Sequence, residues 1–460
     1  MPLRPPPIAA LGALLSLALP VITVQVGLML MGVADTVMVG HLSPEALAAV
    51  ALGNVYYFGV SIFGVGTLMA LDPVIAHAVG AEDHESVARD VQRALVLAVG
   101  LCLPAALLLV PAPQILVALR QPPAVARLAG AYAQASIPGT IGLFAFAVFR
   151  QSLQALHRMR SLLVTVLLAN LTNIALNWVL IFGHLGVPPL GAVGSAWAST
   201  ISRLVMVPML LLIAWPDLRS TVRPLRPGVF EPGPLLRLLK LGAPIGVQHQ
   251  LEYGVFAVVG LLMGTMGIAQ VAGHQVALNL ASLTFMVPLG LSAAAAVLVG
   301  HAVGRGDAKA TRDAARAALY LAVGFMGTAA VVFLALPGPL ARLYSPAPEV
   351  LAVASILIPL AGVFQVFDGI QVTSIGILRG LGDTRTPMLT GVLGFWLVGL
   401  PVSLLLAFRL GYGPAGLWWG LVLGLVAVAS VLLVRLRYKL RQPLRRVRLD
   451  LVADAGAGQR

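Results

Sequence analysis

The sequence is poor in charge and in cysteine. Only 10% of its 460 residues are charged, whereas a soluble domain carries about 25%. The single cysteine, Cys102, lies in an apolar run, so the chain has neither an intramolecular disulfide nor a cysteine-based metal site. These absences exclude an ordinary soluble globular protein and a fold that is held together by disulfides.

Sequence motifs for nucleotide hydrolysis and zinc proteolysis are also missing. No G-x-x-x-x-G-K-[ST] segment occurs, and the three lysines are scattered, so the chain has no ATPase signature. No H-E-x-x-H segment occurs, and the eight histidines are spread along the sequence. The sequence therefore predicts neither an enzyme nor a cofactor-binding protein.

Long apolar runs make up most of the chain. Hydrophobic residues form 59% of the sequence, and the mean hydropathy is +0.95. Apolar runs of about 20 residues recur, a length that crosses a hydrocarbon core of roughly 30 Å. The first run has no clear small-residue cleavage site, so we interpret it as a span rather than a signal peptide. The sequence predicts an all-α membrane protein with twelve transmembrane helices, near residues 11–40, 46–77, 94–112, 130–150, 162–183, 191–214, 241–265, 276–300, 317–337, 350–378, 387–408 and 414–434.

The basic residues gather on one side of this predicted topology. If the N-terminus, the alternate loops and the C-terminus share a side, that side holds 25 of the 30 basic residues. The positive-inside rule then predicts that both termini are cytoplasmic. The basic tail and the net charge of +13 would also suit RNA or acidic lipid, but the charge bias favours a topology anchor. The other five basic residues are Arg120, Arg127, Arg342 and Arg409 in the opposite loops, and Arg203 inside a span.

The two halves of the chain match each other at a shift of 224 residues, with one further residue of offset near the end of each half. The shift that pairs Pro20 with Pro244 also pairs "HAVGAED" (77–83) with "HAVGRGD" (301–307). Each half holds six predicted spans, so we expect parallel repeats related by a pseudo-two-fold axis along the membrane normal. A cleft between two bundles, with rocking about it, would give alternating access. The predicted domains are an N-terminal six-helix lobe (1–214), a cytoplasmic linker (215–234), a C-terminal six-helix lobe (235–436) and a basic cytoplasmic tail (437–460).

Four of the 17 acidic residues lie inside predicted spans, where each costs about 2.5–3.5 kcal/mol at a helix centre. One of them, Asp72, precedes Pro73 near a span end, where water and a helix break can satisfy it. Glu252 and Asp368 each lie 11 or 12 residues from a basic residue at the cytoplasmic side, or roughly 16–18 Å deep. Two acids at one depth suit a cation site. They equally suit proton carriage, because burial and a like charge favour a neutral carboxyl group. A hydrogen-bonded structural pair is the remaining alternative.

The fourth acid, Asp35, belongs to the first half. Its partner position in the second half is Val259, and the partner of Glu252 is Leu28. The halves have therefore diverged at their charged positions. We expect nearby amides of the fifth span either to steady Asp35 or to join helices by hydrogen bonds. These amides recur at helical spacing: Asn170, Asn173 and Asn177.

Several segments taken together resemble a known family. They are "MGVADTVMVGHLSPEALAAVALG" near the start, "RQSLQALHRMR" (150–160), "AGHQVALNLASLTFMVPLGLSAAAAVLVGHAVGRGD" (272–307) and "FDGIQVTSIGILRGLGDTRTP" (367–387). On these motifs, and over essentially its whole length, the chain resembles the multidrug and toxic compound extrusion (MATE) family, in particular its NorM-type bacterial branch.

The resemblance implies an exporter of cationic, amphipathic drugs driven by inward sodium or protons. It implies that the acid of the first lobe is Asp35, and that Glu252 and Asp368 form the cation pair of the second lobe, here the Na⁺ ligands. Phe364 stands where some relatives carry tyrosine, which keeps an aromatic face for a cation. Asn177 stands where other branches carry an acid, which argues against a sodium site in the first lobe. The remaining candidate supporting residues are Gln275, Asn279 and Asn173.

We therefore expect a monomeric secondary antiporter of the bacterial inner membrane. It would export small organic cations in exchange for Na⁺ or H⁺, with sodium favoured, contact membrane lipid, and bind neither nucleic acid nor any cofactor besides the coupling ion. A lipid-linked precursor flippase of the same two-lobe superfamily is the alternative. Such exporters commonly carry extra spans and cationic grooves, whereas here Arg203 alone is basic within a span. A receptor or structural membrane protein would not explain three deep carboxylates.

Overall fold

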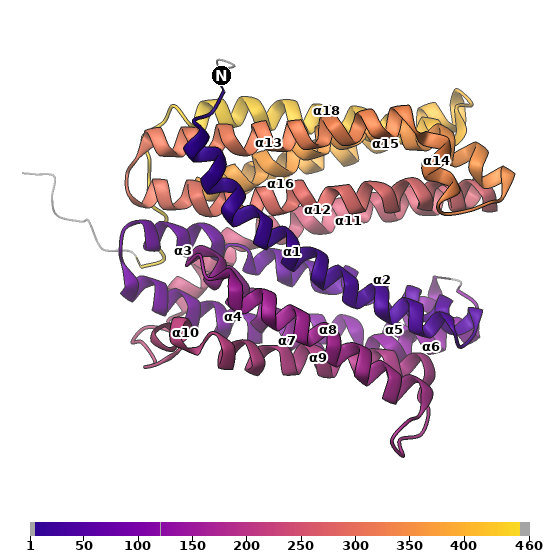
Figure 1. Cartoon of the computed structure of the whole chain (residues 1–460), viewed down its shortest axis with the longest axis horizontal. Helices are drawn as coiled ribbons and strands as arrows, with labels where there is room; N and C mark the ends of the chain where they lie inside the picture. Colours follow the sequence, from indigo (N-terminus) through magenta and orange to yellow (C-terminus); the bar gives the residue numbers. More distant parts are fainter. Residues whose placement is uncertain (1–4, 120, 451–460) are drawn as a thin grey trace, which may run out of the picture. The chain divides into compact units, whose positions relative to one another are not determined.

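The chain folds into helices alone in the part that the structure, a computed structural model, describes: residues 5–119 and 121–450 (Figure 1). The predicted all-α class is confirmed. The helices are α1 (Ile8–Gly40), α2 (Pro44–Leu68), α3 (Leu71–Gly80), α4 (His84–Leu109), α5 (Ala112–Ala118), α6 (Pro123–Ala135), α7 (Gly139–Ala155), α8 (Met159–Phe182), α9 (Gly191–Ile213), α10 (Trp215–Val222), α11 (Pro232–Met266), α12 (Ile268–Gly304), α13 (Ala308–Ala335), α14 (Pro337–Arg342), α15 (Pro348–Gly380), α16 (Arg385–Gly391), the π-helix η1 (Val392–Gly399), α17 (Leu400–Leu404), the π-helix η2 (Leu405–Arg409) and α18 (Gly413–Lys439).

The structure accounts for eleven of the twelve predicted membrane spans by length and hydropathy. Ten of the described helical segments are long and apolar enough to cross a membrane, and α6 with α7, bent by 52°, makes an eleventh. The remaining predicted span, residues 241–265, falls on α11, a continuous helix of 35 residues that is not among these segments. Polar side chains at Gln248, His249, Gln250 and Glu252 make α11 less apolar than the other spans. The chain is a multi-pass membrane protein, and α11, the predicted span that is too polar to be identified by hydropathy, carries the predicted site residue Glu252.

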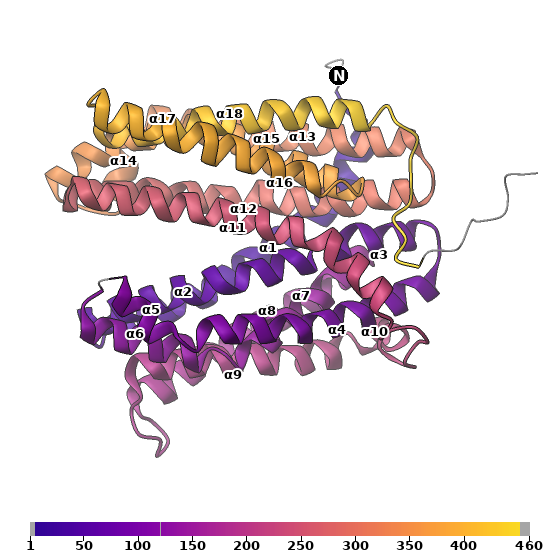
Figure 2. The same cartoon turned by 180° about the vertical axis from the view of Figure 1, so that it is seen from behind.

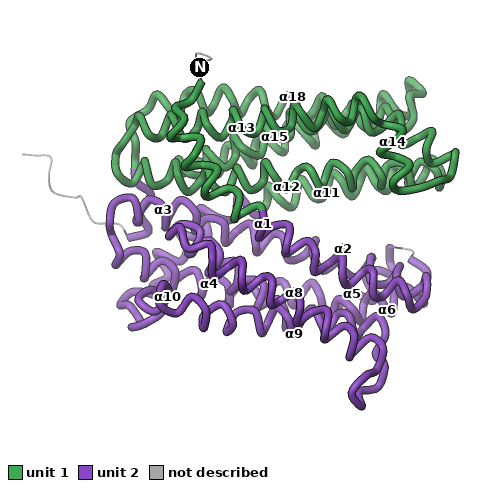
Figure 3. Tube along the Cα trace, viewed as in Figure 1, with its two compact units in different colours: residues 1–22, 247–445 green, residues 23–246, 446–460 purple. Residues whose placement is uncertain are grey.

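The fold divides into two compact units (Figure 3). In the described part, unit 1 contains residues 5–22 and 247–445, and unit 2 contains residues 23–246 and 446–450. These limits differ from the predicted domain boundaries because α1 and α11 each begin in one unit and end in the other. The chain crosses after Ile22 and again after Gly246, which are partner positions of the sequence repeat.

The helices of the two halves follow the same register. For example, α2 and α12 begin at Pro44 and Ile268, which are also partner positions of the repeat. The match is not complete, because Met69 and Ala70 separate α2 from α3 whereas α12 runs unbroken. Asp72 lies in the first turn of α3, where the helix N-terminus stabilises a carboxylate. The helix break expected near this acid is confirmed.

Within unit 1, α12, α13, α15 and α18 run side by side (Figures 1 and 2). A Cβ atom on Gly376 would overlap the Ser292 carbonyl oxygen of α12, so only glycine permits this approach of α15. The Thr284 hydroxyl of α12 donates to Gln365 Oε1 of α15 at 2.6 Å. These contacts fix α15, the helix of Asp368, against α12.

Within unit 2, α8 and α9 pack side by side, and α7 packs against α9 (Figure 2). The approach of α7 to α9 is close, since a Cβ atom on Gly142 would lie 2.5 Å from the carbonyl oxygen of Arg203. The backbone of α9 is thereby fixed at the one basic residue that the sequence places inside a span.

The linker between the halves, residues 215–234, packs against α4. Gln92 Nε2 donates to the carbonyl oxygens of Thr221 and Pro224, both at 3.0 Å. The buried Arg93 donates to the carbonyl oxygen of Gly228 at 3.0 Å. One short polar stretch of α4 therefore holds both ends of the linker loop.

The basic tail also packs on unit 2 as far as residue 450. Arg446 and Asp83 form an ion pair at 2.7 Å, and Asp450 bridges Arg89 and Arg93, each at 2.7 Å. Burial alone would raise the pKa of Asp450, but its hydrogen bonds and charge pairs with these arginines outweigh that and lower it. The tail is thus a packed part of unit 2 as well as a cluster of basic residues.

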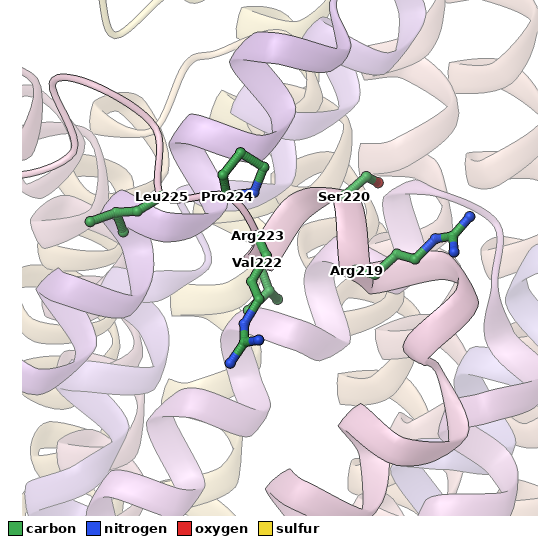
Figure 4. Close-up of a pocket in the computed structure, with 6 residues that line it drawn as sticks. All are labelled: Arg219, Ser220, Val222, Arg223, Pro224 and Leu225. Atoms are coloured by element: carbon green, nitrogen blue, oxygen red, sulfur yellow. The ribbon is translucent and has the colours of Figure 1, made fainter.

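A shallow cavity of about 800 Å³ lies on α10 and the linker (Figure 4). The guanidinium groups of Arg219 and Arg223 point in different directions and do not converge on one ligand position (Figure 4). This cavity is distant along the chain from all three deep carboxylates. The residues that line it are Arg219, Ser220, Val222, Arg223, Pro224 and Leu225.

Candidate functional site

Unit 1 brings Glu252 and Asp368 together. The two carboxylates interact electrostatically, and both side chains are partly exposed. Glu252 Oε1 accepts hydrogen bonds from Gln371 Nε2 at 2.7 Å and from Gln248 Nε2 at 3.2 Å. No hydrogen bond to Asp368 occurs within the described residues. The structure brings the two predicted acids close enough to interact, and Asp368 receives no hydrogen bond from the described residues that would stabilise its charge.

The donor set around this pair suits a hard cation or a proton. The Gln371 Oε1 atom is buried and accepts no hydrogen bond from described residues. Carboxylate and amide oxygens are preferred ligands of hard cations. Residues 5–119 and 121–450 contain no cluster of three or more His, Cys, Asp or Glu side chains that could hold a metal ion. The arrangement therefore fits sodium, completed by amide oxygens or water, better than zinc.

Neighbouring helices fix the backbone around the pair. In the π-helical segment η1, the Trp396 indole N–H donates to the carbonyl oxygen of Leu251 at 3.2 Å, directly before Glu252. A Cβ atom on Gly254 would lie 3.1 Å from the Trp396 ring. Because π-helical turns are frequent at functional sites, the position of η1 beside α11 is consistent with a role in holding Glu252.

An aromatic cluster lies one helical turn before Asp368. Phe364 is buried and packs edge-to-face on Phe256 and Trp418, with ring centroids 6.0 and 5.8 Å away. The Trp418 indole N–H donates to His274 Nδ1 at 3.2 Å, so this histidine nitrogen is an acceptor. The predicted aromatic residue therefore belongs to a packed aromatic wall beside the acidic pair.

Two predicted supporting residues, Gln275 and Asn279, are exposed on α12. Gln275 Nε2 donates to Asn279 Oδ1 at 3.4 Å. The structure thus places them as a polar pair of their own, while Gln248 and Gln371 supply the recorded hydrogen bonds to the acidic pair.

Unit 2 encloses Asp35 in a polar cluster. The side chain is only 5% exposed. Asn177 Nδ2 donates to Asp35 Oδ1 at 2.6 Å, and the Ser199 hydroxyl donates to Oδ2 at 2.5 Å. Asn173 hydrogen-bonds both Asn177 and Ser199, at 3.1 and 3.3 Å. The Asn177 Oδ1 atom is buried without a hydrogen-bond partner in the described part of the chain.

Both expectations for the amides of the fifth span are confirmed, each for a different residue. Asn177 and Asn173 steady Asp35, whereas Asn170 donates to the carbonyl oxygen of Gly27 at 2.9 Å and so joins α8 to α1. Arg203 lies one turn after Ser199 on α9 and interacts electrostatically with Asp35.

Sequence reasoning missed several residues of both clusters. Gln371 lies three residues after Asp368, and Gln248 lies four residues before Glu252, so helical spacing from the known acids could have found both. Ser199 and Trp396 come from other helices, and only the packing of α9 and η1 reveals them.

A model of the MatE family matches residues 20–179 and 244–405, one segment in each half, and the two segments begin at partner positions of the repeat. The fold is similar to that of the eukaryotic MATE transporter AtDTX14, with a TM-score of 0.87 and 23% identity over 94% of this chain and 98% of that chain. It is similar to the MATE transporter VcmN of Vibrio cholerae in its bent form, with a TM-score of 0.82 and 19% identity over 94% and 97%. A MOP superfamily transporter from Pyrococcus furiosus matches with a TM-score of 0.82 and 20% identity over 94% and 96%.

Proposed function

Because the chain belongs to the MatE family of multidrug and toxic compound extrusion transporters, we propose that it is a secondary antiporter that exports small cationic, amphipathic molecules. Inward movement of sodium would drive this export. The protein would work as a monomer in a bacterial inner membrane, with both termini in the cytoplasm, as the bias of basic residues favours.

The observation that carries the proposal is the acidic pair of unit 1. Glu252 and Asp368 interact with each other, and no arginine or lysine of the described chain pairs with either. Two like charges inside a membrane span are unfavourable unless a proton or a cation neutralises them. Because their side chains are partly exposed, an ion can exchange there. The pair therefore suits a coupling site that alternates between loaded and empty states.

Sodium is supported over the proton by the oxygen ligands. Glu252, Asp368 and the unpartnered Gln371 Oε1 offer oxygen ligands from three side chains on two helices. A bound sodium ion would let both carboxylates stay ionised, whereas proton coupling would leave the amide oxygen without a role. Cations are favoured as cargo over the pyrophosphate of a lipid-linked precursor, because the deep charged groups of unit 1, Glu252 and Asp368, are acidic.

Asp35 is proposed as the carboxylate of unit 2 that pairs with the transported organic cation. Its contacts with Asn177 and Ser199 hold the carboxylate oxygens in place. A neutral amide at this position would keep the size but could not balance the charge of a cation.

Flux measurements in proteoliposomes test the proposed function. Purified protein would be reconstituted, and efflux of the fluorescent cation ethidium would be followed under a sodium gradient or a pH gradient alone. We expect efflux that follows the sodium gradient and persists when the pH gradient is removed. Efflux that continues without sodium and collapses with the pH gradient would assign the acidic pair to protons.

Cysteine labelling tests the proposed topology. Cysteines would replace the exposed Arg223 of the linker and the exposed Arg441 of the tail in a chain lacking Cys102. An impermeant thiol reagent should label neither position in intact cells and both after lysis. Efficient labelling in intact cells would place that segment outside the cytoplasm.

A further inference from the structure

The polar cluster of unit 2 contains a positive charge of its own. Arg203 lies inside α9, one helical turn after Ser199, the residue that donates to Asp35 at 2.5 Å. Side chains four residues apart share a helix face, so the guanidinium group lies on the side of α9 that faces Asp35. The positive guanidinium group of Arg203 and the negative carboxylate of Asp35 are close enough to attract each other, which agrees with this placement.

The surroundings of Arg203 hold its guanidinium group as a cation. Its Cζ atom lies 4.7 Å from the ring centroid of Tyr57 on α2, a cation–π contact. The phenol ring of Tyr132 on α6 also interacts with it electrostatically. Both tyrosines are almost fully buried, at 1% and 3% exposure. Aromatic rings and one carboxylate thus surround this charge from three helices other than its own.

This charge is permanent, because a guanidinium group keeps its proton under all physiological conditions. A cation that approaches Asp35 therefore meets a carboxylate that already has a partner. Unit 1 offers the opposite situation, since its two acids have no recorded basic partner in the described chain.

We propose that Arg203 is the resident counter-ion of Asp35, and that it competes with the transported organic cation for this carboxylate. The second part of this inference rests on the function proposed above. By competing, Arg203 lowers the affinity of unit 2 for its cargo and restores a neutral cluster when the cargo leaves. It is a specificity-determining residue: a permanent positive charge disfavours cargo with more than one positive charge.

Binding of tetraphenylphosphonium to purified full-length protein tests the competition. Titration calorimetry should show about tenfold tighter binding to Arg203→Gln, equivalent to about 1.4 kcal/mol, and little change for Arg203→Lys. The gain should disappear in Asp35→Asn/Arg203→Gln. The matched control is Arg150→Gln, because Arg150 of α7 donates to Gln25 at 2.8 Å and is not recorded as a partner of Asp35. Equal or weaker binding to Arg203→Gln, or a gain that survives Asp35→Asn, would overturn the proposal.

The same variants separate this inference from the proposed function. If the wild type neither exports nor binds tetraphenylphosphonium, the proposed function fails, but Arg203→Gln should still gain Asp35-dependent binding. Its failure to do so would overturn the inference.

If Arg203→Gln alone does not fold, thermal unfolding of Asp35→Asn and of the double variant tests whether the two residues are partners. Asp35→Asn should lower the unfolding midpoint because it removes the carboxylate that balances the charge of the half-buried Arg203, and adding Arg203→Gln should restore most of the loss. A double variant that is no more stable than Asp35→Asn alone would show that the residues are not partners, and would contradict the proposal.

Discussion

The two units satisfy their buried carboxylates in different ways. In unit 2, Asp35 is sealed from solvent, receives two short hydrogen bonds and has Arg203 as a nearby cation. In unit 1, Glu252 receives two amide hydrogen bonds, and Asp368 receives none within the described residues. Neither carboxylate of unit 1 has a recorded basic partner in that part of the chain. Unit 2 has a positive side chain of its own near its carboxylate, whereas the carboxylates of unit 1 need a bound proton or cation to balance their charge.

The helices that support these carboxylates differ in the same way. In unit 2, α8 supplies the amides of Asn173 and Asn177 to the Asp35 cluster. The corresponding span of the second half, residues 385–409, is largely π-helical and supplies the Trp396 indole to a backbone carbonyl beside Glu252. The two halves therefore share their membrane spans but differ in the polar contacts that surround their buried carboxylates.

The largest effect is expected for the acids of unit 1. Glu252→Gln and Asp368→Asn should each reduce ion-driven ethidium efflux by about 100-fold or more, because a pair with one neutral member no longer binds and releases a cation. Binding of the organic cation should persist. Glu349→Gln is the matched control, since Glu349 is an exposed acid in the first turn of α15. Efflux near the wild-type rate in either variant would reduce the pair to a structural role.

Asp35→Asn should abolish drug resistance in cells at matched expression while the protein still inserts into the membrane. The expected loss of efflux is at least tenfold, because the amide cannot balance the charge of a cation. Growth assays with ethidium, together with quantification of the protein in membranes, measure both quantities. Full resistance would mean that Asp35 serves only the packing of α1, α8 and α9.

Gln371→Leu should have a smaller effect, confined to the ion. Hydrogen bonds to charged groups contribute about 1.5–3 kcal/mol, so the sodium concentration for half-maximal efflux should rise roughly tenfold with the maximal rate little changed. Gln248→Leu should raise this sodium concentration less, because the hydrogen bond from Gln248 to Glu252 is 3.2 Å long whereas that from Gln371 is 2.7 Å long. The reverse order would contradict the assignment of Gln371 Oε1 as an ion ligand.

The smallest effect is expected at the tail. Asp450→Asn should lower the midpoint of thermal unfolding by only a few degrees, about 1 kcal/mol, because its ion pairs are partly exposed. The exposed Arg448→Gln, two residues away, is the control and should leave the midpoint unchanged. A loss as large as that of the Asp35 variant would mean that the tail is essential to unit 2.

The pH dependence of this docking follows from the carboxylates. Burial would raise the pKa of Asp83, but the Ser86 N–H and Arg446 outweigh it, so its pKa is lowered, as is that of Asp450. A lowered native pKa adds stability above the unfolded value of about 3.9, and this is lost as pH falls through the lower native pKa. The effect of Asp450→Asn should be constant from pH 5 to 8 and vanish in strong acid.

Most of the fold was predictable because apolar spans, and the repeat of their pattern in the second half, can be read directly from the sequence. The three deep carboxylates were predictable for the same reason, since an acid inside an apolar run needs a partner. The partners themselves depend on how helices pack: Ser199 reaches Asp35 only because α9 lies beside α8. The docked tail likewise arises from tertiary contacts, the ion pairs of Arg446 and Asp450 with residues of unit 2.

The contrast between the units is tested most directly by equilibrium binding of radioactive ²²Na⁺ to purified wild type and single variants. We expect sodium binding by the wild type and by Asp35→Asn, and its loss in Glu252→Gln and in Asp368→Asn. Loss of binding in Asp35→Asn, with binding retained in both unit 1 variants, would place the exchangeable ion in unit 2 and contradict the assignment of the coupling site to Glu252 and Asp368.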